Sequence, residues 1–200
     1  MVQVKKVEVE QAITQAAYEL FKAQGYSGTR MPQIAKAAHI SAANIYVYFD
    51  SKLDILVSVY RAWFTERLDE VKTQVLSCKS SAKALRQLLV AMWKTLPAAD
   101  DGFCGTLIEA LSDRSSQEKY STLLRAPTDL ALDQMLAHCL PSATPQNRQA
   151  ISTLLVMAFD GYALNYHLRN GQRALDTDID TLCGIILSAY PEVTKRAKGK

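Results

Sequence analysis

The amino-acid sequence predicts an all-α protein, and three observations support this fold class. Apolar residues recur at spacings of three and four along most of the 200 residues, whereas strand-like alternation is scarce. Glycine and proline are few, at eight and six residues, and several of them fall where a helix would begin or end. A chain of this length can bury a substantial hydrophobic core in one or two domains.

The first sixty residues predict two short helices between two longer ones. Apolar residues at helical spacing from Ile13 to Phe21 predict the first helix, which Gly25 should end. Thr29 is the expected N-cap of a second helix of about ten residues, with Pro32 in its first turn. His39 and Ile40 make the turn that follows.

Ser41 should then cap a third helix that reaches about Phe49, and Asp50 or Ser51 a long fourth helix to about Ser77. Two short helices joined by a tight turn are typical of a helix-turn-helix. Ile45 and Phe49 should face inward with Ile34. Spacing alone leaves open whether Tyr46 and Tyr48 face outward or complete a small core.

The rest of the chain predicts a second helical region. We expect helices over 81–96, ended by Pro97, and over 103–111, and another from a Ser115–Glu118 capping box that Pro127 must interrupt or kink. The pattern continues to Pro141. A helix from Thr144–Pro145 to Arg169 and a last one from Thr177 or Asp178 to about Ala189 complete the set. The expected domains are 1–52, 53–190 and a basic tail over 191–200.

Charge and cysteine content exclude several classes. The net charge of +3 is accounted for by the last ten residues, which carry four Lys or Arg against Glu192, so DNA binding must be argued from pattern. The four cysteines form no CxxC pair, and His138 and His167 have no partner at metal-ligand spacing. We therefore expect neither a metal site nor a cofactor, with redox sensing by a thiol as a minor alternative. The lack of a long apolar run predicts a cytoplasmic protein without membrane association.

The N-terminal pattern resembles the tetracycline-repressor (TetR) family of bacterial transcription regulators. That family has Ala-Ala, Leu-Phe, Gly, Thr, Ile-Ala, Ala, Ser, Tyr, Tyr-Phe and Ser-Lys at set intervals. This chain supplies them in order as Ala16, Ala17, Leu20, Phe21, Gly25, Thr29, Ile34, Ala35, Ala38, Ser41, Tyr46, Tyr48, Phe49, Ser51 and Lys52. The match covers about residues 8–60. His39 stands where the family usually has a turn glycine, and histidine tolerates a left-handed backbone.

The resemblance implies a DNA-binding transcriptional regulator, released by a ligand, that binds a palindromic operator as a homodimer. Its third helix should enter the major groove of double-stranded DNA. Small Ala42 and Ala43 allow close approach, and Asn44 has the groups to bind an adenine edge. The expected DNA-binding residues are Thr29, Arg30, Ser41, Ala42, Ala43, Asn44, Tyr46, Tyr48 and Lys52. Of these, Tyr46, Tyr48, Thr29, Arg30 and Lys52 are candidates for phosphate contacts.

The resemblance also implies a dimer interface on the last two long helices and an effector pocket in the second domain. Ala158, Gly161 and Ala163 are small enough for close helix approach. Candidate pocket residues are Met92, Trp93, Phe103, Cys104, Leu107, Tyr120, Phe159, Tyr162, Tyr166 and His167. Ordinary core packing explains each of them as well. An apolar lining of this kind favours a small hydrophobic or aromatic effector.

Two other classes compete with a regulator. An enzyme needs a nucleophile with a base, paired catalytic carboxylates or a cofactor loop, and the sequence offers none of these, since Glu109 and Asp113 fit a charged helix edge. The remaining alternative is a helical dimeric interaction protein that has lost specific DNA binding, which the unusual turn residue His39 raises. Selection of a palindromic site over bulk DNA separates a regulator from both.

Overall fold

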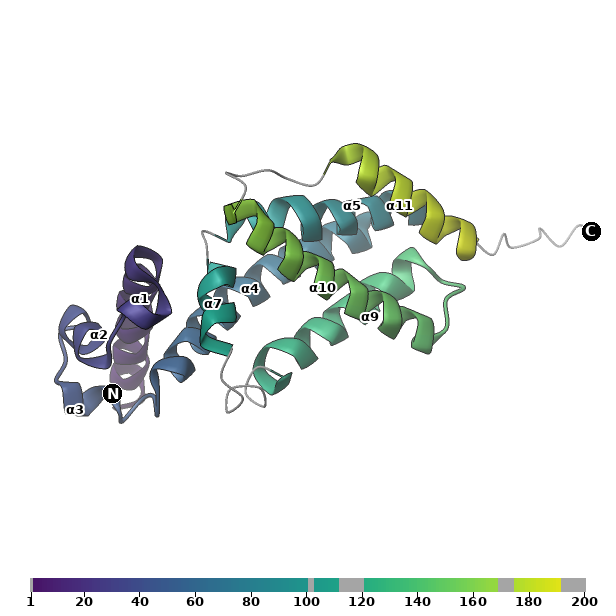
Figure 1. Ribbon diagram of the computed structural model, residues 1–200. Helices are drawn as coiled ribbons and strands as arrows, with labels where there is room; N and C mark the ends of the chain where they lie inside the picture. Colours follow the sequence, from purple (N-terminus) through teal and green to yellow (C-terminus); the bar gives the residue numbers. More distant parts are fainter. Residues whose placement is uncertain (1, 101–102, 112–120, 169–174, 192–200) are drawn as a thin grey trace, which may run out of the picture. The chain divides into compact units, whose positions relative to one another are not determined.

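The computed structural model describes residues 2–100, 103–111, 121–168 and 175–191, and their side chains except at 2–5, 121 and 163–168. All regular elements of these described residues are helical, which confirms the expected fold class (Figure 1). The expected helix at the Ser115–Glu118 capping box and the basic tail lie outside them, apart from Pro191.

The chain divides into two compact units. Residues 1–66 and 100–126 form unit 1, and residues 67–99 and 127–200 form unit 2. Helix α4 (Lys52–Ser77) contributes to both units, because the division falls in its interior between Glu66 and Arg67. The functional domains expected from the sequence have their boundary after residue 52 instead. Compact units and functional domains need not coincide, so the expected domains stay a prediction.

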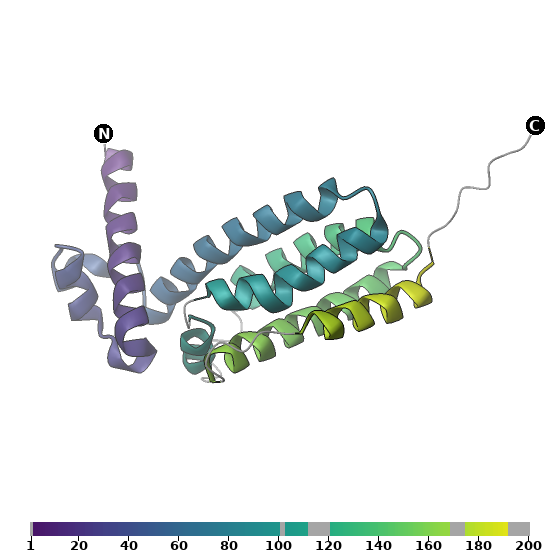
Figure 2. The same ribbon diagram turned by 90° about the horizontal axis from the view of Figure 1, so that it is seen from above.

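Unit 1 begins with one long and two short helices, as the sequence predicts. Helix α1 (Val2–Gly28) is followed by α2 (Met31–Ala37) and α3 (Ala42–Ile45), which lie beside it in both views (Figures 1 and 2). Gly25 has φ 70° and marks a kink in α1, although one further helical turn follows it. The inward-facing Phe21, Ile34 and Ile45 are all at most 1% exposed.

The turn between α2 and α3 is closed by backbone hydrogen bonds of the Schellman type. The amide of Ile40 donates to the carbonyl of Ala35 at 3.0 Å, and that of His39 to Lys36 at 3.2 Å. His39 is the left-handed residue that this motif requires, with φ 57°. The turn therefore keeps its geometry with histidine where glycine is the usual residue.

The caps of the short helices agree with the sequence in one case and differ in another. The hydroxyl of Ser41 accepts the amide of Asn44 at 3.1 Å, which confirms Ser41 as the cap of α3. The expectation that Thr29 caps α2 is wrong. Arg30 occupies that position, and its amide donates to the side chain of Gln33 at 2.7 Å. Thr29 instead points into the core, because its hydroxyl donates to the carbonyl of Gly25 at 2.8 Å.

Helix α3 is shorter than expected. Its α-helical part ends at Ile45, and the chain continues to Phe49 in turns whose amides bond three and four residues back. The next helix, α4, begins after Ser51. The hydroxyl of Ser51 accepts the amide of Asp54 at 3.1 Å and donates to its carboxylate at 2.7 Å. Of the two expected candidates, Asp50 and Ser51, it is therefore Ser51 that caps α4.

The ammonium group of Lys52 joins the start of α4 to the end of α1. Its Nζ atom donates to the carbonyls of Tyr26 and Thr29 at 2.6 and 2.8 Å, and lies 4.0 Å from the centre of the Tyr26 ring. These carbonyls follow the kink at Gly25, where helical bonding is ending, and a cation is a favourable partner for them. Burial lowers the pKa of Lys52, and the nearby Glu109 carboxylate opposes that shift.

Helix α7 (Phe103–Leu111) completes the core of unit 1 by packing on α1. The ring of Phe103 lies 5.4 Å from Tyr18, 6.3 Å from Phe21 and 6.4 Å from Tyr60, measured between ring centres. The buried Asp100 caps this helix, since its carboxylate accepts the amide of Cys104 at 2.7 Å. At the other end of the packed surface, the Ser27 hydroxyl bonds the carboxylate of Glu109.

Unit 2 contains α5 (Ser81–Val90), the π-helical turn η1 (Ala91–Thr95) and α6 (Leu96–Ala99) in one continuous run. The expectation that Pro97 ends this helix is wrong. A proline ring clashes with the carbonyl four residues back and provides no amide for it. The wider π turn directly before Pro97, in which the amide of Leu96 bonds Ala91 five residues back, accommodates the ring within the helix.

Pro127 repeats this arrangement. The π-helical turn η3 (Ser121–Arg125) precedes α9 (Ala126–Cys139), in which Pro127 occupies the first turn. Both prolines therefore lie two residues after a π turn. The sequence predicted an interruption at Pro127, and the π turn is the form that it takes.

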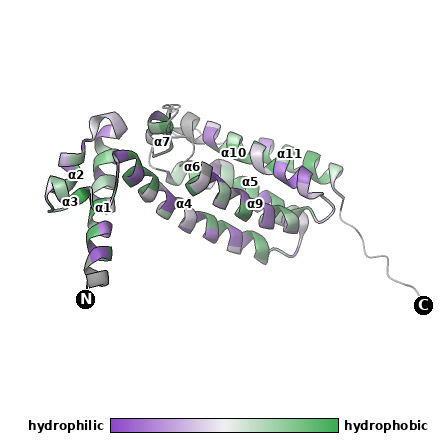
Figure 3. Ribbon diagram, turned by 90° about the horizontal axis from the view of Figure 1, so that it is seen from below, coloured by the Kyte–Doolittle hydropathy of each residue, from purple (hydrophilic) through white to green (hydrophobic). Residues whose placement is uncertain are grey.

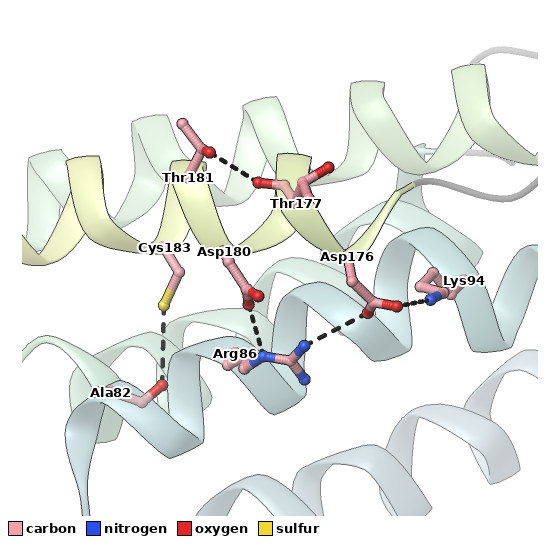
Figure 4. Close-up of polar contacts among 8 residues, drawn as sticks. All are labelled: Ala82, Arg86, Lys94, Asp176, Thr177, Asp180, Thr181 and Cys183. Atoms are coloured by element: carbon pink, nitrogen blue, oxygen red, sulfur yellow. Dashed lines mark hydrogen bonds and ion pairs between the residues drawn. The ribbon is translucent and has the colours of Figure 1, made fainter.

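The last two helices are α10 (Pro145–Leu168) and α11 (Asp176–Ala189). Thr144 caps α10 as expected, since its hydroxyl accepts the amide of Asn147 at 3.2 Å. α11 begins slightly before the predicted Thr177 or Asp178. In its first turn Asp176 pairs with Lys94 at 2.8 Å, and Asp180 with Arg86 at 2.6 Å, which ties α11 to η1 and α5 (Figure 4). The hydrogen bond from Lys94 lowers the pKa of Asp176.

We expect glycine substitutions at His39, in the left-handed turn, and at Lys36, in helix α2, to change the free energy of unfolding in opposite directions. His39→Gly should raise the free energy of unfolding by up to about 1 kcal/mol, because a side chain at positive φ carries about that strain. Lys36→Gly, in the regular helix three residues earlier, should lower it by up to about 1 kcal/mol. Urea denaturation measures both, and a loss of stability in His39→Gly would contradict the strained turn.

Replacing Lys52 should weaken unit 1. Lys52→Met keeps the aliphatic stem but leaves two carbonyls without their charged donor, so we expect a loss of about 1–3 kcal/mol in the free energy of unfolding. Lys36→Met is the matched control, since Lys36 is exposed, and should change stability by less than about 0.5 kcal/mol. Equal denaturation midpoints for the two variants would show that the Lys52 contacts contribute nothing.

Candidate DNA-binding surface

Helix α3 presents a small exposed face. Ala42, Ala43 and Asn44 are exposed, while Ile45 is fully buried and anchors the helix on unit 1. Two of the exposed side chains are no larger than a methyl group, so a flat partner can approach the helix backbone closely. Next to them the amide group of Asn44 offers both a donor and an acceptor, which is the pattern that an adenine edge requires.

The residues after α3 extend this surface. The Tyr46 side chain is 56% exposed, so its hydroxyl is accessible, whereas Tyr48 is half-buried. Of the two orientations that spacing left open, Tyr46 adopts the outward one. Val47 is 68% exposed and was missed at the sequence level, although an apolar residue between two aromatic residues was the available signal. An exposed valine here provides a contact for a thymine methyl group.

The expected phosphate-binding residues differ in how accessible they are. Arg30 is exposed, at the N-cap of α2. Thr29 is 0% exposed and its hydroxyl is used within α1, so the expected contact of this side chain with a phosphate does not fit the structure. Lys52 uses two of its three ammonium hydrogens on backbone carbonyls. Its phosphate contact stays a prediction, with one donor left to make it.

The residues expected to line an effector pocket are distributed over both compact units. Phe103, Cys104 and Leu107 belong to unit 1, where Phe103 is part of the aromatic core between α1 and α4. Met92, Trp93, Phe159 and Tyr162 belong to unit 2, and the rings of Trp93 and Tyr162 lie 5.7 Å apart. Tyr120 and the side chains of Tyr166 and His167 lie outside the described residues. The expected pocket thus remains a prediction.

A groove of about 500 Å³, which no sequence pattern predicted, lies between α1 and α4 within unit 1. Tyr18 and Trp63 contribute aromatic surface, and Glu10 and Glu66 contribute carboxylates. The exposed residues of α3 do not line it. The candidate recognition surface is therefore separate from this groove.

Comparison with known proteins agrees with this geometry. Residues 13–59 match the family model "Bacterial regulatory proteins, tetR family", which spans α1 to α4 and thus includes the whole candidate surface. The fatty acid metabolism regulator protein of Bacillus subtilis (strain 168) is 33% identical over 91 residues, covering 44% of this chain and 45% of that protein. The first three curated relatives match over only 31–45% of their own length.

Solved structures resemble nearly the whole chain. FadR of Bacillus subtilis, a transcriptional regulator in complex with stearoyl-CoA, has a TM-score of 0.64 at 19% identity, covering 90% of this chain and 96% of that one. Thermus thermophilus FadR, a TetR-family transcriptional repressor in complex with lauroyl-CoA, has a TM-score of 0.69 at 18% identity, covering 96% and 99%. At these identities the likeness shows a shared fold.

No helix in the described ranges is long and apolar enough to cross a membrane. By their match to the family model, residues 13–59 form the N-terminal helix-turn-helix of the tetR family of bacterial regulatory proteins.

Proposed function

We propose that this protein is a ligand-released repressor that binds a palindromic operator as a homodimer. The observation that carries this proposal is the exposed face of α3, where Ala42, Ala43 and Asn44 project from a helix whose other side is buried. The left-handed turn at His39 keeps its Schellman hydrogen bonds, so the reason for suspecting a lost DNA-binding function is weak.

The proposed mechanism divides the surface into reading and positioning groups. With α3 in the major groove, Asn44 would make two hydrogen bonds to an adenine, and the alanines and Val47 would contact thymine methyl groups. Arg30 and Tyr46, both exposed, would hold phosphates on either side and fix the register without reading sequence. A two-fold dimer would present two such helices about 34 Å apart, one helical turn of DNA.

The proposed dimer interface lies on α10 and α11. Both helices carry hydrophobic residues, drawn green in Figure 3. Leu154 and Met157 on α10 are 65% and 63% exposed, and Ile185 on α11 is 59% exposed. A Cβ atom added at Gly161 or Gly184 would meet no neighbour within 4 Å, so these positions allow a second backbone to approach. Exposed apolar side chains beside such open positions favour a partner helix.

The proposed effector is a fatty acyl-CoA, a more specific choice than the small hydrophobic or aromatic effector expected from the sequence. Two structures with this fold contain acyl-CoA molecules, and a relative that is 33% identical over 91 residues is a fatty acid metabolism regulator. By linkage, an effector that binds the DNA-free conformation more tightly must weaken operator binding by the same factor. Lauroyl-CoA should therefore both stabilise the protein against unfolding and release it from its operator.

Operator selection followed by mutation tests DNA reading. Genomic fragments bound by the protein should share a palindrome, and Asn44→Ala should cost about 1–3 kcal/mol on it and relax the preference at one position in each half-site. Binding to random DNA should change little. Asn147→Ala, an exposed asparagine at the start of α10, is the matched control and should bind as the unmodified protein does. Equal losses on operator and random DNA would remove base reading from Asn44.

A charge placed on α10 should separate the subunits. Leu154→Glu would bury an unpaired carboxylate in each half of the interface, so we expect the dimer to dissociate at least about 100-fold more readily. Leu130→Glu changes a leucine on α9 with almost the same exposure, 63%, and should leave the dimer intact. Light scattering at micromolar concentration distinguishes the two variants. A dimeric Leu154→Glu, or a monomeric unmodified protein, would contradict this interface.

A further inference from the structure

Among the described residues, the indole N–H of Trp93 is a buried donor without a partner. The Trp93 side chain is 6% exposed, and its Nε1 atom has no hydrogen-bond acceptor in the described part of the chain. Indole nitrogen can only donate, so this group cannot be satisfied by another donor. Such a group is costly to bury, and it gains most from an acceptor that a ligand brings.

The position of Trp93 in the fold points to a binding role. It lies in the π turn η1, an element that is frequent at functional sites and that here also accommodates Pro97. Its ring is tilted by 35° against that of Tyr162 on α10. Phe159, one turn earlier on α10, is 2% exposed, and Met92 beside Trp93 is fully buried. The Trp93 ring thus lies against an aromatic ring of α10 within unit 2, with its N–H buried.

The neighbouring charge indicates which acceptor fits. Lys94 follows Trp93 in the same turn, and its ammonium group is paired with Asp176 of α11 at 2.8 Å (Figure 4). That cation is therefore already neutralised by a carboxylate of the protein. A second carboxylate brought by a ligand would gain little from it, whereas a neutral carbonyl needs only the single N–H donor.

We propose that the indole N–H of Trp93 donates a hydrogen bond to the thioester carbonyl of the bound fatty acyl-CoA, with the acyl chain in the apolar surroundings of α10 and η1. This rests on the proposed acyl-CoA effector and adds the group that recognises the acyl function. The protein would then prefer a neutral acyl carbonyl to ligands of the same length and shape that lack one.

The test compares two ligands that differ only at the carbonyl. Lauroyl-CoA and S-dodecyl-CoA have the same chain length and the same nucleotide, but the thioether has a methylene group in place of the carbonyl. Calorimetric titration of the unmodified protein should show about tenfold tighter binding of lauroyl-CoA, the effect of one hydrogen bond to an otherwise unpaired donor. In Trp93→Phe this ratio should fall to about one, even if both affinities decrease because the smaller ring leaves a gap.

A spectroscopic measurement identifies the donor directly. The chain contains two tryptophans, so Trp63→Phe leaves Trp93 as the only indole signal and serves as the control that keeps the tenfold ratio. With ¹⁵N-labelled tryptophan, the indole proton of Trp93 should move downfield on adding lauroyl-CoA and should not do so on adding S-dodecyl-CoA.

The outcomes separate this inference from the function on which it rests. If both ligands bind equally and the indole proton does not move downfield, the hydrogen bond is wrong while the acyl-CoA effector stands. If neither ligand binds at millimolar concentration, the effector assignment fails and the role of Trp93 fails with it. If lauroyl-CoA binds tenfold more tightly but the ratio persists in Trp93→Phe, another group reads the carbonyl.

Discussion

The contact between Lys52 and the end of α1 is the constraint on which the recognition surface depends. Helix α3 is too short to be stable by itself, because ordering its single turn costs conformational entropy and forms only a few hydrogen bonds. Its orientation is fixed by Ile45 in the core, by the Schellman turn before it, and by the start of α4 after it. Lys52 holds that start against Tyr26 and Thr29. Lys52, a candidate for a phosphate contact, thus also maintains the orientation of α3 that DNA binding would need.

Lys52 was expected only to contact a phosphate, and its hydrogen bonds to backbone carbonyls were not predicted from the sequence. A lysine at the start of the helix that follows a helix-turn-helix is equally suited to a DNA phosphate and to helix carbonyls, because both provide oxygen acceptors. Only the kink at Gly25, which frees the carbonyls of the following residues, decides that two of its hydrogens are used internally. Thr29 was misassigned for a related reason. A threonine before a proline-containing helix fits an N-cap, but the same kink provides the Gly25 carbonyl as its partner.

The sequence was most informative where local chemistry alone determines structure. Ser41, Ser51 and Thr144 cap their helices as expected, and His39 adopts the left-handed backbone that its place after α2 requires. It was least informative at Pro97. The rule that proline ends a helix assumes a regular α-helical turn before it, and the π turn η1 removes that assumption. The expected pocket residues share one apolar pattern although Phe103 and Phe159 belong to different compact units, and that distinction depends on tertiary contacts that no spacing records.

The continuity of α4 limits how an effector could act on the DNA-binding residues. Its first turn contains Lys52 in unit 1, and its last turns belong to unit 2, with the helix unbroken between them. An effector bound at Trp93 would act on DNA binding through a different affinity for the conformations that bind and release DNA. Shifting such an equilibrium from mostly bound to mostly released requires a difference of about 10⁴-fold between the two conformations. The proposed hydrogen bond to the Trp93 indole would provide at most about tenfold of this. With the proposed acyl-CoA effector, the acyl chain and the nucleotide would supply most of the discrimination between the two conformations. Trp93 would then decide which ligands are recognised more than how completely they release the operator.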